Sequence, residues 1–214
     1  MHAQLTPDNV LPFRPLTSLL PPRQPLQFCP SGSEIFGQGE PVGPVYQVDF
    51  GAVRVYRLLP DGRRQISAFH LSGEAFGFES APLHHFFAEA IVATGLRAYR
   101  QTPGIDIAGE LLPLALQSLI RAQEHLLVLG RQNAMERIAV FLADLEERQG
   151  GTGHIDLPMP RSDIGDYLGL TIETVSRILT KLKAKGIIKL VSMRSVEISN
   201  RDALLGVSEC KFAA

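Results

Sequence analysis

The segment of residues 160–186 constrains the fold most, because its pattern predicts two short helices joined by a tight turn. Ser162 can cap the first helix, and Gly169 provides the backbone conformation that a turn between helices requires. Thr171 can cap the second helix, which is expected to end at Gly186. Apolar residues at helical spacing would form the buried faces: Ile164, Tyr167 and Leu168 in the first helix, and Val175, Ile178, Leu179 and Leu182 in the second. This arrangement predicts a helix-turn-helix.

The outward face of the second predicted helix favours DNA binding. Its first two turns present Ile172, Glu173, Ser176 and Arg177, and the early positions of such a helix contact base edges in the major groove. Arginine can donate two hydrogen bonds to guanine, a carboxylate can accept one from cytosine, and serine or an apolar group can meet thymine. We therefore expect these four residues to read bases. A compatible alternative is a salt bridge between Glu173 and Arg177, which would stabilise the helix by only ~0.2–0.5 kcal/mol.

Positive charge gathers in the same segment, although the whole chain carries a net charge of −1. Residues 172–194 contain six Lys and Arg side chains but only one carboxylate, that of Glu173. A local basic surface on an otherwise acidic protein suits contact with phosphates. The candidates for phosphate contacts are Ser162, Thr171, Thr174, Lys181, Lys183, Lys185 and Arg194. A solvated helix face would give a similar charge pattern, so the neighbouring turn is what favours the DNA-binding interpretation.

The first half of the chain predicts a proline-rich arm followed by a β-roll. Residues 1–30 contain seven prolines, which remove backbone donors and disfavour regular structure. Over residues 31–110, short apolar runs alternate with turn residues, as in residues 45–58, a hairpin turn at residues 60–62, and residues 65–71. Such a pattern is typical of an antiparallel roll or jelly roll. After Gly186, two strands at residues 187–190 and 195–198 predict the wing of a winged helix-turn-helix. The expected fold class is therefore α+β.

Residues 111–150 predict one long helix and a hinge between the two domains. Spacings of three and four residues give a heptad-like seam: Leu112, Leu116, Leu119, Gln123, Leu126, Gly130, Asn133, Arg137 and Val140. We expect a second copy of the chain to cover this seam, so that the protein is a homodimer. A second stripe is expected to pack against the chain's own domains, which is also the alternative for the seam: Ile120, Leu127, Ala134, Ile138 and Phe141. Residues 149–153 would form a linker, and residues 151–214 the C-terminal domain.

Composition excludes several classes of protein. Cys29 and Cys210 are the only cysteines, so no disulfide framework is expected, and a reducing cytoplasm is the expected location. No apolar run approaches the ~20 residues of a membrane span, and no signal peptide is evident. His84 and His85 would point to opposite faces of an extended segment, so we expect no metal site there. A jelly-roll enzyme would need several converging metal ligands, whereas the pattern places only His70 on a strand, so catalysis is not expected.

The chain resembles the Crp-Fnr superfamily of regulators, and within it the Fnr and FixK-like branch, over nearly its whole length. The resemblance rests on residues 62–77 (GRRQISAFHLSGEAFG), 125–141 (HLLVLGRQNAMERIAVF) and 163–177 (DIGDYLGLTIETVSR). The E-x-x-S-R pattern of the family falls on Glu173, Ser176 and Arg177, which implies a DNA palindrome of the TTGAT…ATCAA type. The resemblance also implies a transcription activator, connected with nitrogen fixation or microaerobic metabolism. Such an activator would contact RNA polymerase through loops of the roll and around residues 148–156.

The roll departs from the ligand-binding members of this family. Fnr-type oxygen sensors carry a cluster of cysteines near the N-terminus, where this chain has Cys29 alone, so no iron–sulfur cluster is expected. Aligned through Gly77, Phe78 stands where the cyclic-nucleotide branch has a glutamate for the ribose, and Ala88-Glu89 stands where it has an Arg-Ser pair for the phosphate. A carboxylate about 4 Å from a phosphate costs ~4 kcal/mol near a surface, which disfavours cyclic nucleotides. We expect no cofactor; the alternatives are an unidentified small-molecule effector in the roll, or cysteine redox control.

Overall fold

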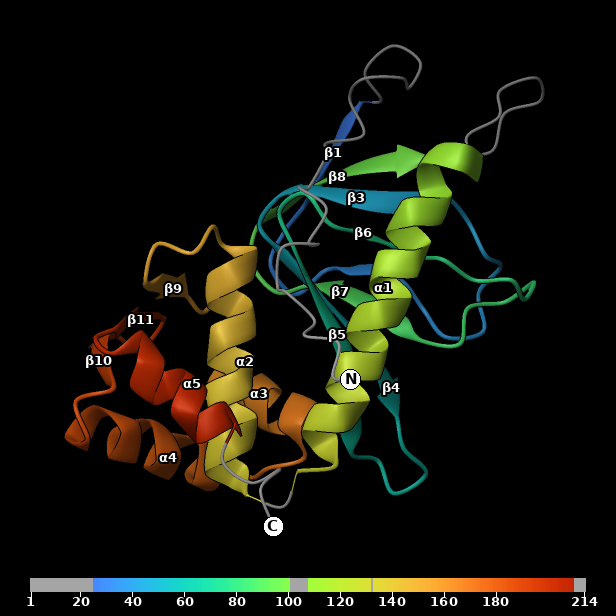
Figure 1. Cartoon of the computed structure of the whole chain (residues 1–214). Coiled ribbons are helices and arrows are strands. Elements are labelled where there is room, and N and C mark those ends of the chain that lie inside the picture. Colours follow the sequence, from blue (N-terminus) through green and yellow to red (C-terminus); the bar gives the residue numbers. More distant parts are fainter. Residues whose placement is uncertain (1–24, 101–107, 132, 210–214) are drawn as a thin grey trace, which may run out of the picture.

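The computed structural model describes residues 25–100, 108–131 and 133–209. Its N-terminal part is a roll of two four-stranded antiparallel sheets, with strand orders β1-β8-β3-β6 and β2-β7-β4-β5 (Figure 1). The strands are β1 (Leu26–Cys29), β2 (Glu34–Phe36), β3 (Val45–Phe50), β4 (Ala52–Leu58), β5 (Arg64–Leu71), β6 (Ala75–Phe76), β7 (Phe87–Ala90) and β8 (Thr94–Tyr99). Val48, Val53, Phe76 and Leu96 are almost completely buried between the sheets. The predicted antiparallel roll is therefore confirmed.

The roll begins earlier than the sequence pattern indicates. Residues 1–24 of the predicted arm lie outside the described residues, but residues 26–29 form β1, which pairs with β8 and places Cys29 opposite Thr94. The prediction that the arm extends to residue 30 was therefore wrong at its end. Prolines at positions 25 and 30 flank the strand instead of interrupting it, so every residue of β1 keeps the backbone N–H that a ladder needs.

Gly51 divides the apolar run of residues 45–58 into two strands, β3 and β4. Its φ of +89° lies in the left-handed region, and a Cβ at this position would lie only 2.5 Å from Thr94 Oγ1. Only glycine fits both conditions. The predicted hairpin at residues 60–62 is present, because β4 and β5 pair in antiparallel register on either side of this turn.

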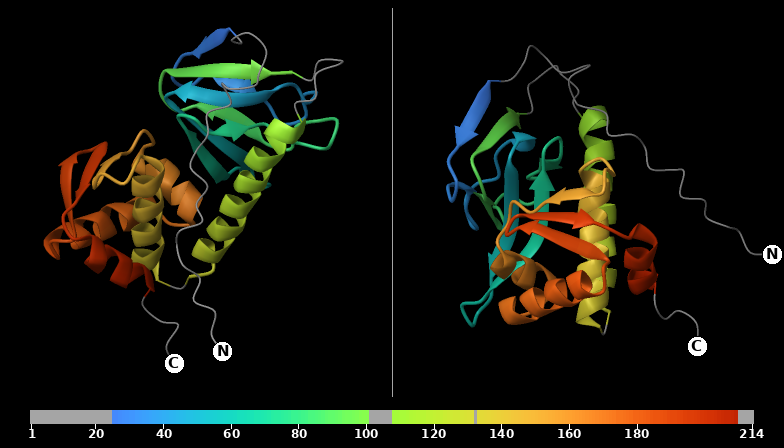
Figure 2. Two further views of the ribbon diagram at one scale, coloured as in Figure 1. Left: turned by 45° about the horizontal axis from the view of Figure 1, so that its top comes forward. Right: turned by 90° about the vertical axis from the view of Figure 1, so that its left-hand side faces the viewer.

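The predicted long helix is in fact two helices, α1 (Ala108–Leu129) and α2 (Ala134–Arg148). The two helices diverge: α1 lies beside the roll, whereas α2 lies within the C-terminal part (Figure 2). Gly130 follows the end of α1, and Asn133 caps α2 by accepting a hydrogen bond from the backbone N–H of Met135 at 2.9 Å. The expectation of one continuous helix was wrong because a glycine and a capping asparagine, three residues apart in the sequence, provide a stop and a start.

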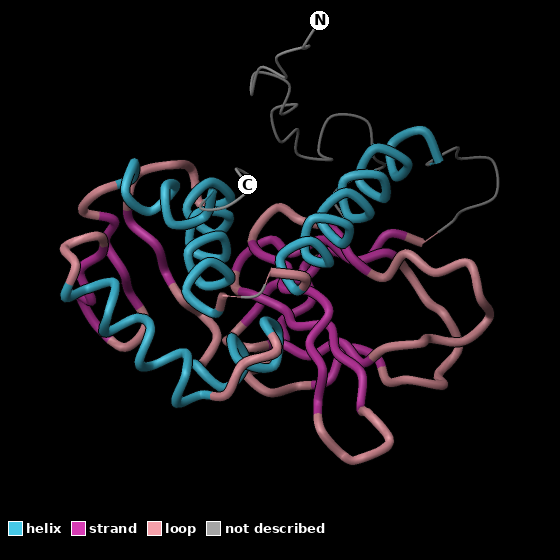
Figure 3. Tube along the Cα trace, turned by 60° about the horizontal axis from the view of Figure 1, so that its bottom comes forward, coloured by secondary structure: helices cyan, strands magenta, loops and turns pink. Residues whose placement is uncertain are grey.

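The C-terminal part is a winged helix-turn-helix, which we call the head (residues 154–209). Its elements are β9 (His154–Asp156), α3 (Arg161–Leu168), α4 (Ile172–Ala184), β10 (Ile188–Ser192), β11 (Ser195–Ile198) and α5 (Arg201–Glu209). Figure 3 shows α4 at the outer edge of the head, and the strands follow the order β10-β11-β9. The predicted wing is confirmed, but the sequence analysis missed β9 and α5. β9 is only three residues long and follows a glycine-rich turn, so its pattern resembles a linker.

One hydrophobic core joins the roll to the head. Phe69 of β5, Phe141 of α2 and Tyr167 of α3 lie against one another, with ring centroids between 5.0 and 6.3 Å apart. Ile138 and Leu145 of α2 are 1% and 0% exposed in the same cluster. α2 therefore contributes to the packing of both parts, and the head rests on the roll through apolar contacts as well as through its chain connection.

Candidate DNA-binding interface

The turn between α3 and α4 is built on two glycines. Gly169 follows α3 in the left-handed conformation, with φ of +65°, as predicted. Gly165, which the sequence analysis did not single out, lies so close to the turn that a Cβ there would be 2.6 Å from the carbonyl oxygen of Leu170. Thr171 caps α4, because its Oγ1 accepts a hydrogen bond from the backbone N–H of Thr174 at 3.3 Å. These contacts fix the angle at which α4 leaves the turn.

Ser162 does not cap α3, contrary to the prediction. The helix begins at Arg161, its N-cap residue is Pro160, and no side chain accepts a hydrogen bond at this end. Proline has an extended ψ here, which suits the residue before a helix. Ser162 therefore lies inside the first turn, where its exposed side chain remains available to an outside partner.

The four predicted base-reading residues lie in the first two turns of α4. Ile172 is 46% exposed, Glu173 and Arg177 are exposed, and Ser176 is half-buried. The buried face of the helix is formed by Val175, Ile178, Leu179 and Leu182. The amphipathic pattern has therefore placed the polar groups at the surface and the apolar groups in the core.

Charged groups on this side of the head have few partners inside the protein. The Glu173 carboxylate accepts hydrogen bonds from its own backbone N–H and from the Thr171 hydroxyl, which lower its pKa and keep it ionised at neutral pH. Within the described ranges it forms no ion pair with Arg177, so the alternative of a salt bridge on α4 is not observed. In the wing, by contrast, Lys189 pairs with Glu197 at 3.1 Å.

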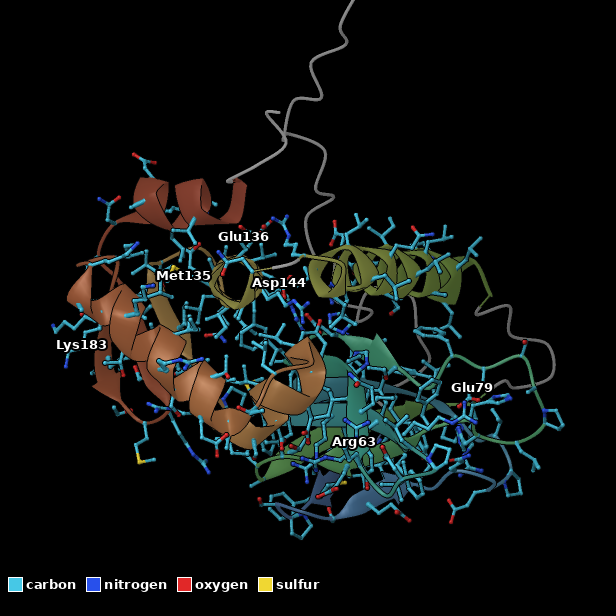
Figure 4. All side chains as sticks on the ribbon, turned by 90° about the horizontal axis from the view of Figure 1, so that it is seen from below. Arg63, Glu79, Met135, Glu136, Asp144 and Lys183 are labelled. Atoms are coloured by element: carbon cyan, nitrogen blue, oxygen red, sulfur yellow. The ribbon has the colours of Figure 1, made fainter. Side chains whose placement is uncertain are left out.

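The cationic phosphate-contact candidates are all exposed. They are Lys181, Lys183 and Lys185 at the end of α4, and Arg194 in the wing; none of them forms an ion pair with another described residue. Among the uncharged candidates, Thr171 is exposed and Thr174 is half-buried. Lys183 lies at the outer edge of the head, at the opposite end of the molecule from Glu79 of the roll (Figure 4).

Arg161 is a residue of this surface that the sequence analysis missed. Its Nη1 donates a hydrogen bond to Oγ of Ser176 at 3.2 Å, across the crossing of α3 and α4. An arginine at the first position of the helix before a recognition helix is the signal that could have identified it. The structure thus adds a cation directly beside the predicted base-reading residues.

The side of α3 that faces the roll is acidic, and its carboxylates are paired. Asp163 has a side chain only 2% exposed and contacts Arg54 Nη1 at 2.6 Å and Arg64 Nη2 at 2.5 Å. Arg64 also pairs with Asp166 at 2.9 Å, and Arg54 pairs with Glu89 within the roll. The partners are about a hundred residues apart in the chain, with separations of 109 and 99 for the two Asp163 contacts, so no local sequence pattern could reveal them.

α1 presents an apolar face that no described part of the chain covers. Its exposed side chains are Leu112 (59%), Leu116 (50%), Leu119 (53%), Ile120 (54%), Leu126 (67%) and Leu127 (73%), and Gln123 of the predicted seam is also exposed. The prediction that Ile120 and Leu127 pack against the chain's own domains was therefore wrong. None of the helices in the described ranges, α1 included, is long and apolar enough to cross a membrane.

The remaining seam positions do not share this face. Gly130 and Asn133 belong to the break between the helices. Arg137 of α2 donates a hydrogen bond to the carbonyl oxygen of Leu168 at 3.0 Å, and Val140 packs against the core of the head. The seam prediction was wrong here because the break starts a new helix in a different direction, and heptad spacing has no meaning across it.

The roll carries no arginine or serine at the two positions where the phosphate of a cyclic nucleotide was considered. Ala88 is fully buried in the roll, and the Glu89 carboxylate is held by Arg54. Phe78 lines a cavity of about 580 Å³, which reaches His125 of α1 and Tyr167 of α3. The cavity is therefore mainly apolar and extends from the roll to the head.

His84 and His85 do not point to opposite faces, contrary to the prediction. Their Nδ1 atoms lie 2.8 Å from the two carboxylate oxygens of Glu79, because the chain here is a loop and not an extended strand. Within the described residues, no three potential metal ligands are grouped. Burial raises the pKa of the Cys29 thiol, which keeps it protonated, and Cys210 lies outside the described residues.

Comparison with known proteins matches both parts of the chain. The cyclic nucleotide-binding domain matches residues 26–100, and the Crp-like helix-turn-helix domain matches residues 136–207. The nitrogen fixation regulation protein FixK of Rhizobium meliloti is 56% identical over 173 residues, which cover 81% of this chain and 82% of the relative. FixK of Azorhizobium caulinodans is 46% identical over 80% of this chain and 74% of the relative. The structure of FixK2 from Bradyrhizobium japonicum has 44% identity and a TM-score of 0.82, covering 88% of this chain and 98% of that one.

The FixK2 structure shares the fold over 88% of this chain, and the resemblance inferred from the sequence is confirmed. The relatives are regulators, so the alternative of a jelly-roll enzyme is not supported. The match to the cyclic nucleotide-binding domain covers the roll, in which the positions considered for the ligand carry Phe78, Ala88 and Glu89. The chain therefore belongs to the Crp-Fnr family and is a FixK-like transcription regulator with a helix-turn-helix DNA-binding domain.

Proposed function

We propose that this regulator binds as a homodimer to a palindrome of the TTGAT…ATCAA type and acts mainly as an activator. The observation that carries the proposal is the outward face of α4, where Glu173 and Arg177 are exposed and unpaired with each other. Two opposite charges that lie one helical turn apart without forming an ion pair suit a surface that binds an external partner. The names of the FixK relatives connect the target genes with nitrogen fixation, and microaerobic metabolism is the related setting that we propose.

The chemistry of the four residues fits the TTGAT half-site. Arg177 can donate two hydrogen bonds to the single guanine, and Glu173 can accept one from the amino group of the opposite cytosine. Ser176 and Ile172 are suited to the thymines, whose methyl groups favour apolar contact. The lysines at the end of α4 and Arg194 of the wing then approach the phosphates on either side.

The apolar face of α1 supports the homodimer. A helix with six large apolar side chains at least half exposed needs a cover, and the same face of a second copy would bury both at once. A parallel arrangement of two α1 helices would place the two heads on one side of the dimer. The centres of the half-sites would then lie about one helical turn of DNA apart, ~34–36 Å.

We propose that DNA binding requires neither a cyclic nucleotide nor an iron–sulfur cluster. A second candidate is control by a small effector, and the cavity of about 580 Å³ between the roll, α1, α2 and α3 favours it. Redox control through Cys29 is less well supported, because a buried thiol with a raised pKa is a poor nucleophile. Contact with RNA polymerase would involve loops of the roll and residues 148–156, and we propose a cytoplasmic location, where the bacterial genome lies.

The experiment that tests the proposal is a fluorescence-anisotropy titration of the purified protein with a TTGAT…ATCAA duplex and a scrambled duplex. It is run in air, at a stated salt concentration and without added ligand. We expect tight and sequence-selective binding. Weak binding to both duplexes would contradict binding without an effector, and a gain on addition of cell extract would then support the second candidate.

The dimer is tested separately with Leu119→Glu, which places a charge at the centre of the α1 face. We expect wild type to sediment as a dimer at micromolar concentration and the variant as a monomer. Leu58→Glu, on an exposed leucine of the roll (50%), is the matched control and should remain dimeric. A monomeric wild type would contradict this part of the proposal.

A further inference from the structure

Arg161 of α3 contacts the hydroxyl of Ser176, one of the four predicted base-reading residues of α4. A serine hydroxyl has one hydrogen to donate and two lone pairs that can accept. It can therefore face either a donor or an acceptor on a base, so that a lone serine on a recognition helix distinguishes bases poorly. Whatever fixes the direction of its hydrogen decides what it can read.

Arg161 restricts that direction, because a guanidinium can only donate. Its Nη1 lies 3.2 Å from Ser176 Oγ, so one lone pair of the serine is occupied by a cationic donor. Within the described chain the Ser176 O–H has no acceptor of its own. The carbonyl of Ser176 is itself occupied, since it accepts a hydrogen bond from the Thr180 hydroxyl at 2.9 Å.

The surroundings of Arg161 differ from those of the arginines that hold the roll and the head together. Arg54, Arg64 and Arg148 each form an ion pair with a carboxylate. Arg161 forms none with any described residue, and its Nε, like that of Arg54, is buried without a hydrogen-bond partner. The protein thus keeps a costly, partly buried cation beside Ser176 without neutralising it. Packing alone would be served equally well by an apolar side chain.

We propose that Arg161 is a specificity-determining residue: it accepts no bond itself, occupies a lone pair of Ser176, and directs the serine O–H toward a hydrogen-bond acceptor on a base edge. Suitable acceptors in the major groove are N7 of a purine, O6 of guanine and O4 of thymine. The amino groups of adenine and cytosine are disfavoured, because they would bring a donor toward a hydroxyl already bound to a cation. This assignment rests on the proposed function, in which α4 reads the half-site.

The test measures the dissociation constants of TTGAT…ATCAA duplexes from which one acceptor at a time has been removed. The probes are 7-deazaguanine, 7-deazaadenine and a thymine analogue without O4, placed in turn at each base of the half-site. The proteins are wild type, Ser176→Ala, Arg161→Met, Arg161→Lys and Lys183→Met. Methionine keeps the length of the arginine stem without a donor, and Lys183→Met is the matched control that removes a cation of α4 with no contact to Ser176.

We expect one probe position at which wild type binds about five- to tenfold more weakly, as the loss of one hydrogen bond implies. Ser176→Ala should not respond to that probe, and Arg161→Met should respond by less than about twofold. Arg161→Lys should fall between Arg161→Met and wild type, because a lysine donates from a less fixed position. Lys183→Met should bind all duplexes more weakly and keep the full response.

Two results would overturn the assignment while leaving the proposed function intact. One is an Arg161→Met variant that binds every duplex more weakly but keeps the wild-type response, which would make Arg161 only a phosphate contact or a packing residue. The other is a wild type that prefers TTGAT to the scrambled duplex but responds to no acceptor removal that Ser176→Ala abolishes. Loss of all preference for TTGAT in wild type would overturn the proposed function and this assignment together. If Arg161→Met does not fold, Arg161→Lys decides, since an unchanged wild-type response there also contradicts the assignment.

Discussion

The two sides of the helix-turn-helix differ in whether their charged side chains form ion pairs within the chain. On the side that faces the roll, Asp163 is almost completely buried and contacts Arg54 and Arg64. On the outer side, Arg177 and Lys183 are exposed and form no ion pair with any described residue. The inner charges are satisfied within the chain, whereas the outer charges are free to meet an anion.

This difference separates residues that hold the head in place from residues that bind DNA. Breaking a buried ion pair leaves an uncompensated charge in a poorly solvated place, which is costly for folding. Removing an exposed cation changes stability little, because water already solvates it. Variants on the inner side should therefore affect unfolding, and variants on the outer side should affect DNA affinity. An inner-side variant that changed only DNA affinity, or an outer-side variant that changed mainly stability, would contradict this division.

The largest effect is expected from Asp163→Asn, which removes the buried carboxylate shared by Arg54 and Arg64 and leaves them only their more exposed partners, Glu89 and Asp166. We expect the free energy of unfolding to fall by about 3–5 kcal/mol, measured by chemical denaturation of the duplex-free protein. Asp166→Asn, whose side chain is 34% exposed, is the matched control and should cost about 0–1 kcal/mol. Equal effects of the two substitutions would show that Asp163 is not the main electrostatic contact between roll and head.

A pH titration tests the inner side at His125, which stacks on Tyr167 of α3 with ring centroids 3.8 Å apart. Both ring nitrogens are buried without a partner, and burial lowers the pKa of His125 to about 4. The unfolded chain binds a proton here below about pH 6.5 while the folded chain does not, so acidification from pH 6.5 to 4 favours unfolding. His125→Phe keeps the stacked ring but cannot take up a proton. Its free energy of unfolding should therefore fall less than that of wild type between pH 6.5 and 4, by at most about 3 kcal/mol. Parallel stability curves for the two proteins would contradict the prediction; exposed His154→Gln serves as the control.

On the outer side, Arg177→Ala should weaken binding to the TTGAT…ATCAA duplex by about 1–3 kcal/mol and relax the preference at one guanine per half-site. Its free energy of unfolding should stay within about 0.5 kcal/mol of wild type. The measurement is anisotropy with duplexes that carry each base at that position. Retained preference for guanine would assign the reading of this base to another residue.

The smallest effect is expected from Lys183→Ala, which removes one exposed cation from the end of α4. Binding to specific and scrambled duplexes should weaken alike, and the salt dependence of log Kd should fall by about one unit of slope. Comparison with Arg177→Ala sharpens the division within the outer side. If both variants lost specificity equally, the separation into base-reading and phosphate-contacting residues would be wrong.

The head was predictable from the sequence because its signals are local. Gly169 and Thr171 mark the turn and the cap directly, and the apolar spacing of α4 places its outward residues by geometry alone. Ser162 was misplaced as a cap because serine is a common N-cap residue, whereas α3 begins two positions earlier, after Pro160. The long-range contacts of Asp163 could not be predicted, since they depend on how two separately folded surfaces meet.

The helices between roll and head show where periodicity fails. The spacing of three and four residues between seam positions continues in register through Gly130 and Asn133, although the chain changes direction there. Spacing alone does not record a change in the axis of a helix, so the seam was carried from an exposed face of α1 into the buried face of α2. The edge strand β1 was missed for a related reason: prolines beside it dominate the composition of its surroundings.

The break at Gly130 also determines where this protein could be recombined with a relative. The glycine-rich stretch of residues 149–153 looks like the natural crossover point, yet a chimera joined there would separate α2 from the helices it packs against. Ile138 and Leu145 are nearly inaccessible to solvent because α3, α4 and α5 surround α2, and an exchanged head would have to rebuild that interior with foreign side chains. A crossover at residues 130–133 moves α2 together with the head and cuts only a connection of four residues. What a designer should graft is therefore the head with its supporting helix, and the remaining surface to be matched includes Arg54, Arg64, Phe69 and Glu74 of the roll, the last of which pairs with Arg148 of α2.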